Sequence, residues 1–71
     1  MTKEEAVEIA RARAGFEPCA QRGCVQVRFL RRGVPARGFW LVGLRSTLEE
    51  RPRARVAVFL VDARTGEVSR A

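Results

Sequence analysis

Two strand-like segments constrain this chain most, because both carry apolar side chains on both of their faces. Residues 39–46 place Trp40 on one face of an extended strand, and Phe39 and Leu41 on the other. Residues 54–62 alternate in the same way, with apolar side chains on either side. Strands of this type are usually covered on both faces. The fold must therefore shield two surfaces of a sheet.

One helix is available for that task. Thr2 and Glu5 have the spacing of a capping box, and Gly15 can adopt the positive φ that often follows a last helical turn. Between them, alanine is frequent on the apolar side, which suits close packing against a sheet. Residues 25–30 alternate as a half-buried strand. Asp62 and Gly66 have the chemistry of a tight hairpin turn, which leads to a short return strand.

These elements predict one α+β domain spanning residues 1–71. The expected architecture is one N-terminal helix packed on a three- to four-stranded antiparallel sheet, an α-β-β-β meander with a short C-terminal return strand. At this length a single small core is the limit, because a domain of this size buries only about 60% of its unfolded surface.

A single helix covers only one face of such a sheet. The other face then exposes apolar side chains, and exposed patches of this kind usually mark an interface. A homodimer or another protein is the expected cover. Alternatively, loops 17–24 and 46–53 fold over the second face. The residues predicted to carry packing or the interface are Phe39, Trp40, Leu41 and Phe59.

The chain is strongly basic, with a net charge of +6 and an isoelectric point near 11.3. All of its basic residues except Lys3 are arginines. They are either a solvated surface or a site for a phosphate-rich partner such as nucleic acid. If the loops around 31–38 and 46–53 lie at one end of the sheet, they form an anion-binding site beside Phe39 and Trp40. Its candidate residues are Arg28, Arg31, Arg32, Arg37, Arg53 and Arg55.

The two cysteines, Cys19 and Cys24, leave several states open. Free thiols are the default in a cytoplasmic protein. A disulfide between them would close a short loop, and intermolecular metal or redox use is a third option. With no histidine in the chain, two thiolates cannot complete a four-ligand zinc site.

Few side chains in this sequence could act as catalytic groups. The chain has neither histidine nor tyrosine, and Ser46 and Ser69 have no neighbouring base to activate them. No glycine-rich phosphate loop is present. We therefore expect a non-enzyme without a metal or cofactor. Because no apolar run approaches a membrane span and the N-terminus is not a signal sequence, a cytoplasmic protein without membrane contact is expected.

Three segments resemble the PepSY domain family: residues 5–10 in the helix, residues 40–42 in the second strand, and the closing segment 61–68, VDARTGEV. The resemblance implies a helix packed on an antiparallel sheet. It also implies a non-catalytic module which, in some members, belongs to a protease propeptide and restrains peptidase activity. We expect a PepSY-like protein-binding or regulatory module that acts through the apolar sheet face. The alternative is a small basic nucleic-acid-binding protein that uses its arginine-rich loops.

Overall fold

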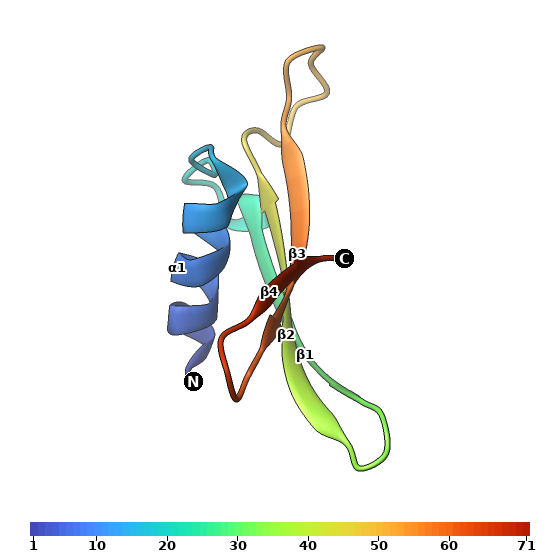
Figure 1. Ribbon diagram of the computed structural model, residues 1–71. Coiled ribbons are helices and arrows are strands. Elements are labelled where there is room, and N and C mark those ends of the chain that lie inside the picture. The colour runs from blue at the N-terminus through green and yellow to red at the C-terminus, as the bar shows by residue number, and fades with distance from the viewer.

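The computed structural model describes residues 1–71 as one helix packed on a four-stranded antiparallel sheet of order β1-β2-β3-β4 (Figure 1). This confirms the expected fold class. The helix contains 12 residues and is not long and apolar enough to cross a membrane. The elements are α1 (Lys3–Ala14), the 3₁₀ turn η1 (Arg22–Cys24), β1 (Val25–Arg32), β2 (Arg37–Arg45), β3 (Val56–Asp62) and β4 (Val68–Arg70).

The helix begins and ends at the predicted residues. The Thr2 hydroxyl accepts a hydrogen bond from the Glu5 N–H at 3.2 Å, and the Glu5 carboxylate accepts one from the Thr2 N–H at 3.0 Å. This reciprocal capping box also lowers the pKa of Glu5. At the other end, Gly15 adopts a left-handed φ of 77°. Ala6 and Ala10 are fully buried, so their small side chains allow α1 to approach the sheet closely.

The core lies between α1 and one face of the sheet. In register, Phe59 lies opposite Val42, and Ala57 lies opposite Leu44, so these side chains share the face that α1 covers. All are buried, and Phe59 is the largest fully buried side chain. The buried cluster consists of Ala6, Ala10, Val42, Leu44, Ala57, Phe59 and Val61.

The β1–β2 hairpin extends beyond the helix at one end and the β2–β3 loop at the other, and the molecule measures 41 Å along its length against 19 and 18 Å in the other directions (Figure 1). The hairpin connection is shorter than the sequence predicted, because pairing continues to Arg32 and Arg37. The ring of Phe29 lies over Gly38, where an added Cβ would come within 2.5 Å of it. Phe29 also packs edge-to-face against Trp40, with ring centroids 4.9 Å apart. The glycine therefore allows an aromatic pair to pack on the extended hairpin.

The loop between α1 and β1 contains a disulfide between Cys19 and Cys24. The expectation of free thiols was therefore wrong, and the alternative of a disulfide is the one observed. The Cys19 N–H donates to the carbonyl of Arg45 at 3.1 Å, and Cys24 is fully buried. Sequence spacing could not decide between the two states, because a disulfide depends on how the loop folds back on the end of β2.

Candidate binding face of the sheet

The sheet face opposite α1, here called the open face, is defined by the strand register. Gln26, Gly43 and Val58 form one cross-strand row, and Arg28, Leu41 and Leu60 form the next. Further rows place Phe39 opposite Asp62 and Arg45 opposite Val56. The open face comprises Gln26, Arg28, Leu30, Arg32, Arg37, Phe39, Leu41, Gly43, Arg45, Val56, Val58, Leu60, Asp62 and Ser69.

No part of the chain covers the middle of the open face. Val56 is 57% exposed and Val58 is 38% exposed, whereas Phe39, Leu41 and Leu60 are half-buried among their neighbours. The predicted alternative, that loops fold over this face, is therefore wrong. The β2–β3 loop instead continues past the end of the sheet (Figure 1). A strip of apolar side chains remains accessible on β2 and β3.

The residues predicted to carry packing or the interface divide between the two faces. Phe39 and Leu41 lie on the open face, whereas Trp40 and Phe59 point to the helix side and pack in or against the core. Phe59 is only 1% exposed. The two-residue period of a strand places neighbouring residues on opposite faces, so Phe39 and Trp40 cannot contribute to one flat surface.

The two basic clusters lie at opposite ends of the molecule. The β1–β2 turn carries one cluster and the β2–β3 loop, with Arg53 and Arg55, carries the other (Figure 1). The prediction of one shared anion site was therefore wrong. Successive connections of an antiparallel meander alternate between the two ends of a sheet, which separates them. The Arg55 guanidinium lies 5.7 Å from the centroid of the Phe16 ring, at the helix side.

The first basic cluster is itself divided by the strand period. Arg28, Arg32 and Arg37 belong to the open face, whereas Arg31 pairs with Gly38 on the helix side. Arg45, at the far end of β2, adds a fourth arginine to the open face. Sequence reasoning did not include Arg45, although its alternation with Phe39, Leu41 and Gly43 indicates the same face.

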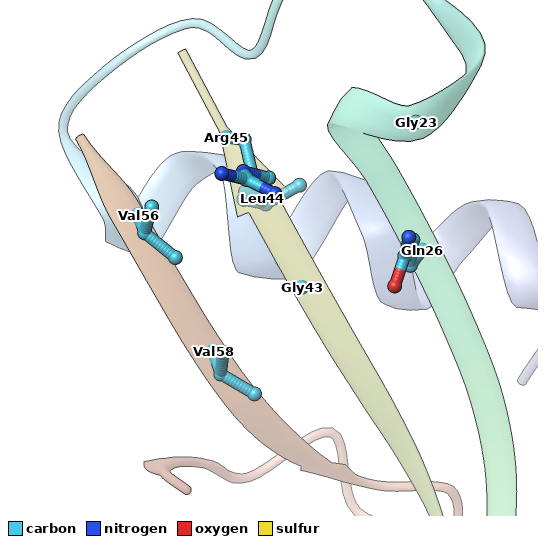
Figure 2. A pocket seen from close by; sticks show the side chains of 7 residues that line it. All are labelled: Gly23, Gln26, Gly43, Leu44, Arg45, Val56 and Val58. Atoms are coloured by element: carbon cyan, nitrogen blue, oxygen red, sulfur yellow. The ribbon is translucent and has the colours of Figure 1, made fainter. Parts of the chain in front are cut away.

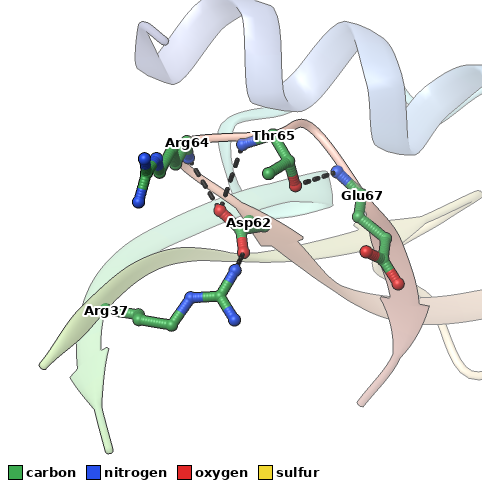
Figure 3. Close-up of polar contacts among 5 residues, drawn as sticks. All are labelled: Arg37, Asp62, Arg64, Thr65 and Glu67. Atoms are coloured by element: carbon green, nitrogen blue, oxygen red, sulfur yellow. Dashed lines mark hydrogen bonds and ion pairs between the residues drawn. The ribbon is translucent and has the colours of Figure 1, made fainter. Parts of the chain in front are cut away.

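Asp62 is the one buried residue whose register position lies on the open face, at 5% exposure. One carboxylate oxygen accepts hydrogen bonds from the N–H groups of Arg64 at 2.8 Å and Thr65 at 3.1 Å. The other oxygen accepts from the Arg37 guanidinium (Figure 3). Gly66 has a φ of 78°, which completes the turn. The predicted turn chemistry of Asp62 and Gly66 is thus confirmed.

The hydrogen bonds of this turn shift the pKa of Asp62. The Arg64 N–H has the largest effect and lowers the pKa, and the Thr65 N–H and Arg37 lower it further, while burial opposes them by raising it. The carboxylate is therefore kept ionised and occupied by partners from its own chain. Asp62 fixes the position of Arg37 at the end of the open face, with the guanidinium 5.8 Å from the centroid of the Phe39 ring.

A groove crosses the open face above Gly43 (Figure 2). Gln26 of β1 and Val58 of β3 form its two walls, and the missing side chain of Gly43 leaves its floor open. One end of the groove, a hollow of about 390 Å³, is bounded by Arg45 and Val56. The other end continues towards Arg28 and Leu41. The groove therefore has an apolar middle and an arginine at each end.

The groups that could support reaction chemistry are engaged in the fold. The Ser46 hydroxyl accepts a hydrogen bond from the Arg55 N–H at 2.8 Å. Both cysteine sulfurs are in the disulfide. No three histidine, cysteine, aspartate or glutamate side chains gather as a metal-binding group. What the open face offers is an apolar strip and unpaired guanidinium groups, which are suited to binding.

Comparison with known proteins gave no match to a family model, a curated protein or a solved structure.

Proposed function

We propose that this protein is a non-catalytic, PepSY-like protein-binding or regulatory module that acts through the open face. The observation that carries the proposal is the exposure of Val56 and Val58 beside the half-buried Phe39, Leu41 and Leu60, on a sheet face without a covering layer. Sheets in folded domains normally bury apolar faces against a second layer. A docked protein supplies that layer.

The partner in this proposal is another protein or a second copy of the chain. The resemblance to the PepSY family supports a regulatory role, including modulation of a peptidase, because some members of that family restrain peptidases. The engagement of Ser46, Cys19, Cys24 and Asp62 within the fold is consistent with a binding role that needs no catalytic group.

The test compares three forms of the chain: the wild type, Val58→Asp, and the control Val34→Asp. Val34 lies in the β1–β2 turn and is fully exposed, so its substitution introduces the same charge away from the open face. Proteins recovered from cells that produce the chain are purified and titrated against each form by calorimetry. Sedimentation velocity at several concentrations measures self-association.

A buried carboxylate without a partner is costly, so Val58→Asp is expected to weaken association by about tenfold or more, while Val34→Asp leaves it unchanged. The proposal fails if the wild type stays monomeric and no purified protein distinguishes Val58→Asp from Val34→Asp.

Nucleic-acid binding is the second candidate, favoured by Arg28, Arg32 and Arg37 on one face next to Phe39. It predicts binding that falls steeply with salt concentration and weakens in Arg28→Glu with Arg32→Glu. Adding a single-stranded oligonucleotide to the sedimentation series distinguishes the two candidates.

A further inference from the structure

Nothing in the backbone conformation or the packing requires glycine at position 43 of β2. Its φ is not left-handed, unlike those of Gly15, Gly33 and Gly66. A Cβ at position 43 would have only the Gln26 carbonyl oxygen near it, at 4.0 Å. Glycine inside a strand weakens the strand and often marks a place where another group approaches closely. Here its effect is to leave the groove of the open face unfilled.

The groove has a size and lining suited to an apolar side chain. Val58 contributes methyl groups on the β3 side, and Gln26 lines the β1 side (Figure 2). Leu41 adds further methyl groups at the other end of the groove. An aliphatic side chain placed there would bury its own surface and that of Val58 together. No aromatic platform for a nucleobase lies in this groove. Phe39, the ring of the open face, lies further along β2 and has the Arg37 guanidinium near it.

Charge on the open face identifies the chemistry of the occupant. Arg28, Arg32 and Arg45 have no ion pair, since the pairs of the molecule involve Arg11, Arg37 and Arg51. Asp62 is the carboxylate that the strand register places on the open face, and it already forms an ion pair with Arg37. Glu67 lies only at its β4 margin. Three guanidinium groups are therefore free to bind carboxylates of a partner.

The same charges oppose a second copy as the occupant. In a two-fold symmetric dimer the same surface meets itself, so the arginines of one open face would lie against those of the other. Opposing like charges at an interface are costly. The carboxylates of α1 lie on the helix side, away from such a contact.

We infer that the occupant of the open face is an acidic, amphipathic segment of another protein. It inserts an apolar side chain into the groove over Gly43 and places carboxylates against Arg28 and Arg45. This inference rests on the proposed function and specifies its partner.

The test is selection from a display library of random 16-residue peptides on the immobilised chain, followed by titration of the selected peptides. Four forms are compared: the wild type, Gly43→Val, the double variant Arg28→Gln with Arg45→Gln, and the control Arg13→Gln with Arg31→Gln. The two double variants carry the same net charge, but Arg13 lies on α1 and Arg31 on the helix side of β1. The Cβ of Gly43→Val would meet only the Gln26 carbonyl oxygen, at 4.0 Å, and a thermal midpoint at or above that of the wild type verifies that the variant folds.

Selected peptides are expected to be rich in aspartate and glutamate around one or two large aliphatic residues. Their dissociation constants are expected to rise about tenfold or more in Gly43→Val, which has no room for the inserted side chain. In Arg28→Gln with Arg45→Gln they rise about fivefold, as expected for two exposed ion pairs. The control changes them by less than about twofold. Amide NMR shifts of Gln26, Gly43 and Val58 locate the bound peptide.

The inference is overturned if the selected peptides lack acidic residues, if no peptide is selected, or if the two double variants weaken binding equally. It is also overturned if an oligonucleotide or an anionic lipid vesicle displaces every selected peptide, binds the chain more tightly than the peptides do, and binds wild type and Gly43→Val equally. A concentration-dependent dimer that Val58→Asp abolishes would retain the proposed function and overturn the inference, because the occupant would then be a second copy. The experiments therefore distinguish failure of the proposed binding function from failure of the inference about an acidic partner.

Discussion

The two faces of the sheet are formed by the same strands, yet one face is buried under α1 and the other is partly exposed to solvent. On the helix side, Val42, Phe59 and Val61 are buried under the alanines of α1. On the open face, Val58 is 38% exposed and Leu41 is half-buried. Both faces are rich in aliphatic side chains, so hydrophobicity alone does not distinguish them. The difference lies in what covers each face. On the helix side α1 packs on the sheet, and the Arg70 guanidinium lies 5.4 Å from the centroid of the Phe59 ring. The open face has no such layer, and Arg28, Arg32, Arg37 and Arg45 surround its apolar strip.

An apolar strand face can either form part of a core or remain at the surface, and the two faces of this sheet differ in that way. A helix covers the first, and guanidinium groups keep the second hydrated. Arg37 illustrates the arrangement: it lies directly opposite Arg32, an unfavourable like-charge pair, and its guanidinium is turned to Asp62.

The strongest test of the comparison truncates one phenylalanine on each face. Phe59→Ala is expected to destabilise the fold by about 3–5 kcal/mol, because it leaves a cavity in the core. Phe39→Ala is expected to cost about 1 kcal/mol, because its ring is only partly buried. Urea unfolding followed by circular dichroism measures both. Equal costs would show that the open face is also core. If Phe59→Ala does not fold, Phe59→Leu and Phe39→Leu provide the same comparison.

An intermediate effect is expected from the disulfide in the loop between α1 and β1, which is hydrogen-bonded to the end of β2. Removing the bond between Cys19 and Cys24, with reductant or in the double variant Cys19→Ser with Cys24→Ala, should cost about 2 kcal/mol by the chain-entropy model for a loop this short. Unfolding in the presence and absence of dithiothreitol measures the loss. The double variant contains no cysteine and is the control, with no response to reductant expected. A wild type whose unfolding is the same with and without dithiothreitol would contradict the disulfide.

The smallest effect is a pH dependence from Asp62, the buried polar residue of the open face. Folding lowers its pKa below the ordinary value of 3.8, so its ionised form stabilises the fold. That stability is fully present above the unfolded pKa and is lost as the pH falls through the lower, folded pKa. Asp62→Asn should therefore flatten the decline of the urea midpoint below about pH 4.

Glu5 provides the control for this measurement, because its pKa is also lowered, through the capping box. Glu5→Gln removes its part of the acid dependence, so the contribution of Asp62 is read in that background. An unchanged acid dependence in Glu5→Gln with Asp62→Asn would show that neither carboxylate produces it.

Local chemistry made several features predictable. The capping box of Thr2 and Glu5, the left-handed Gly15 and the Asp62 turn each depend on a few neighbouring residues, and the structure has all three. Strand alternation also placed Phe39 and Leu41 on the same face. The separation of the two basic clusters could also have been predicted from the sequence, because successive loops of an antiparallel meander lie at opposite ends of the sheet. The grouping of Arg53 and Arg55 with Arg31 overlooked that rule.

The amino-acid sequence by itself determined the order of the elements, the limits of α1, the hairpin turn at Asp62 and the two-sided apolar character of β2 and β3. Only the tertiary structure decided which face α1 covers, that Cys19 and Cys24 meet, and that Gly43 lies at the floor of a groove between Arg28 and Arg45. Turns and caps are set by contacts between residues close in the chain. The coverage of a face and the shape of a groove depend instead on the packing and register of strands that are distant in sequence.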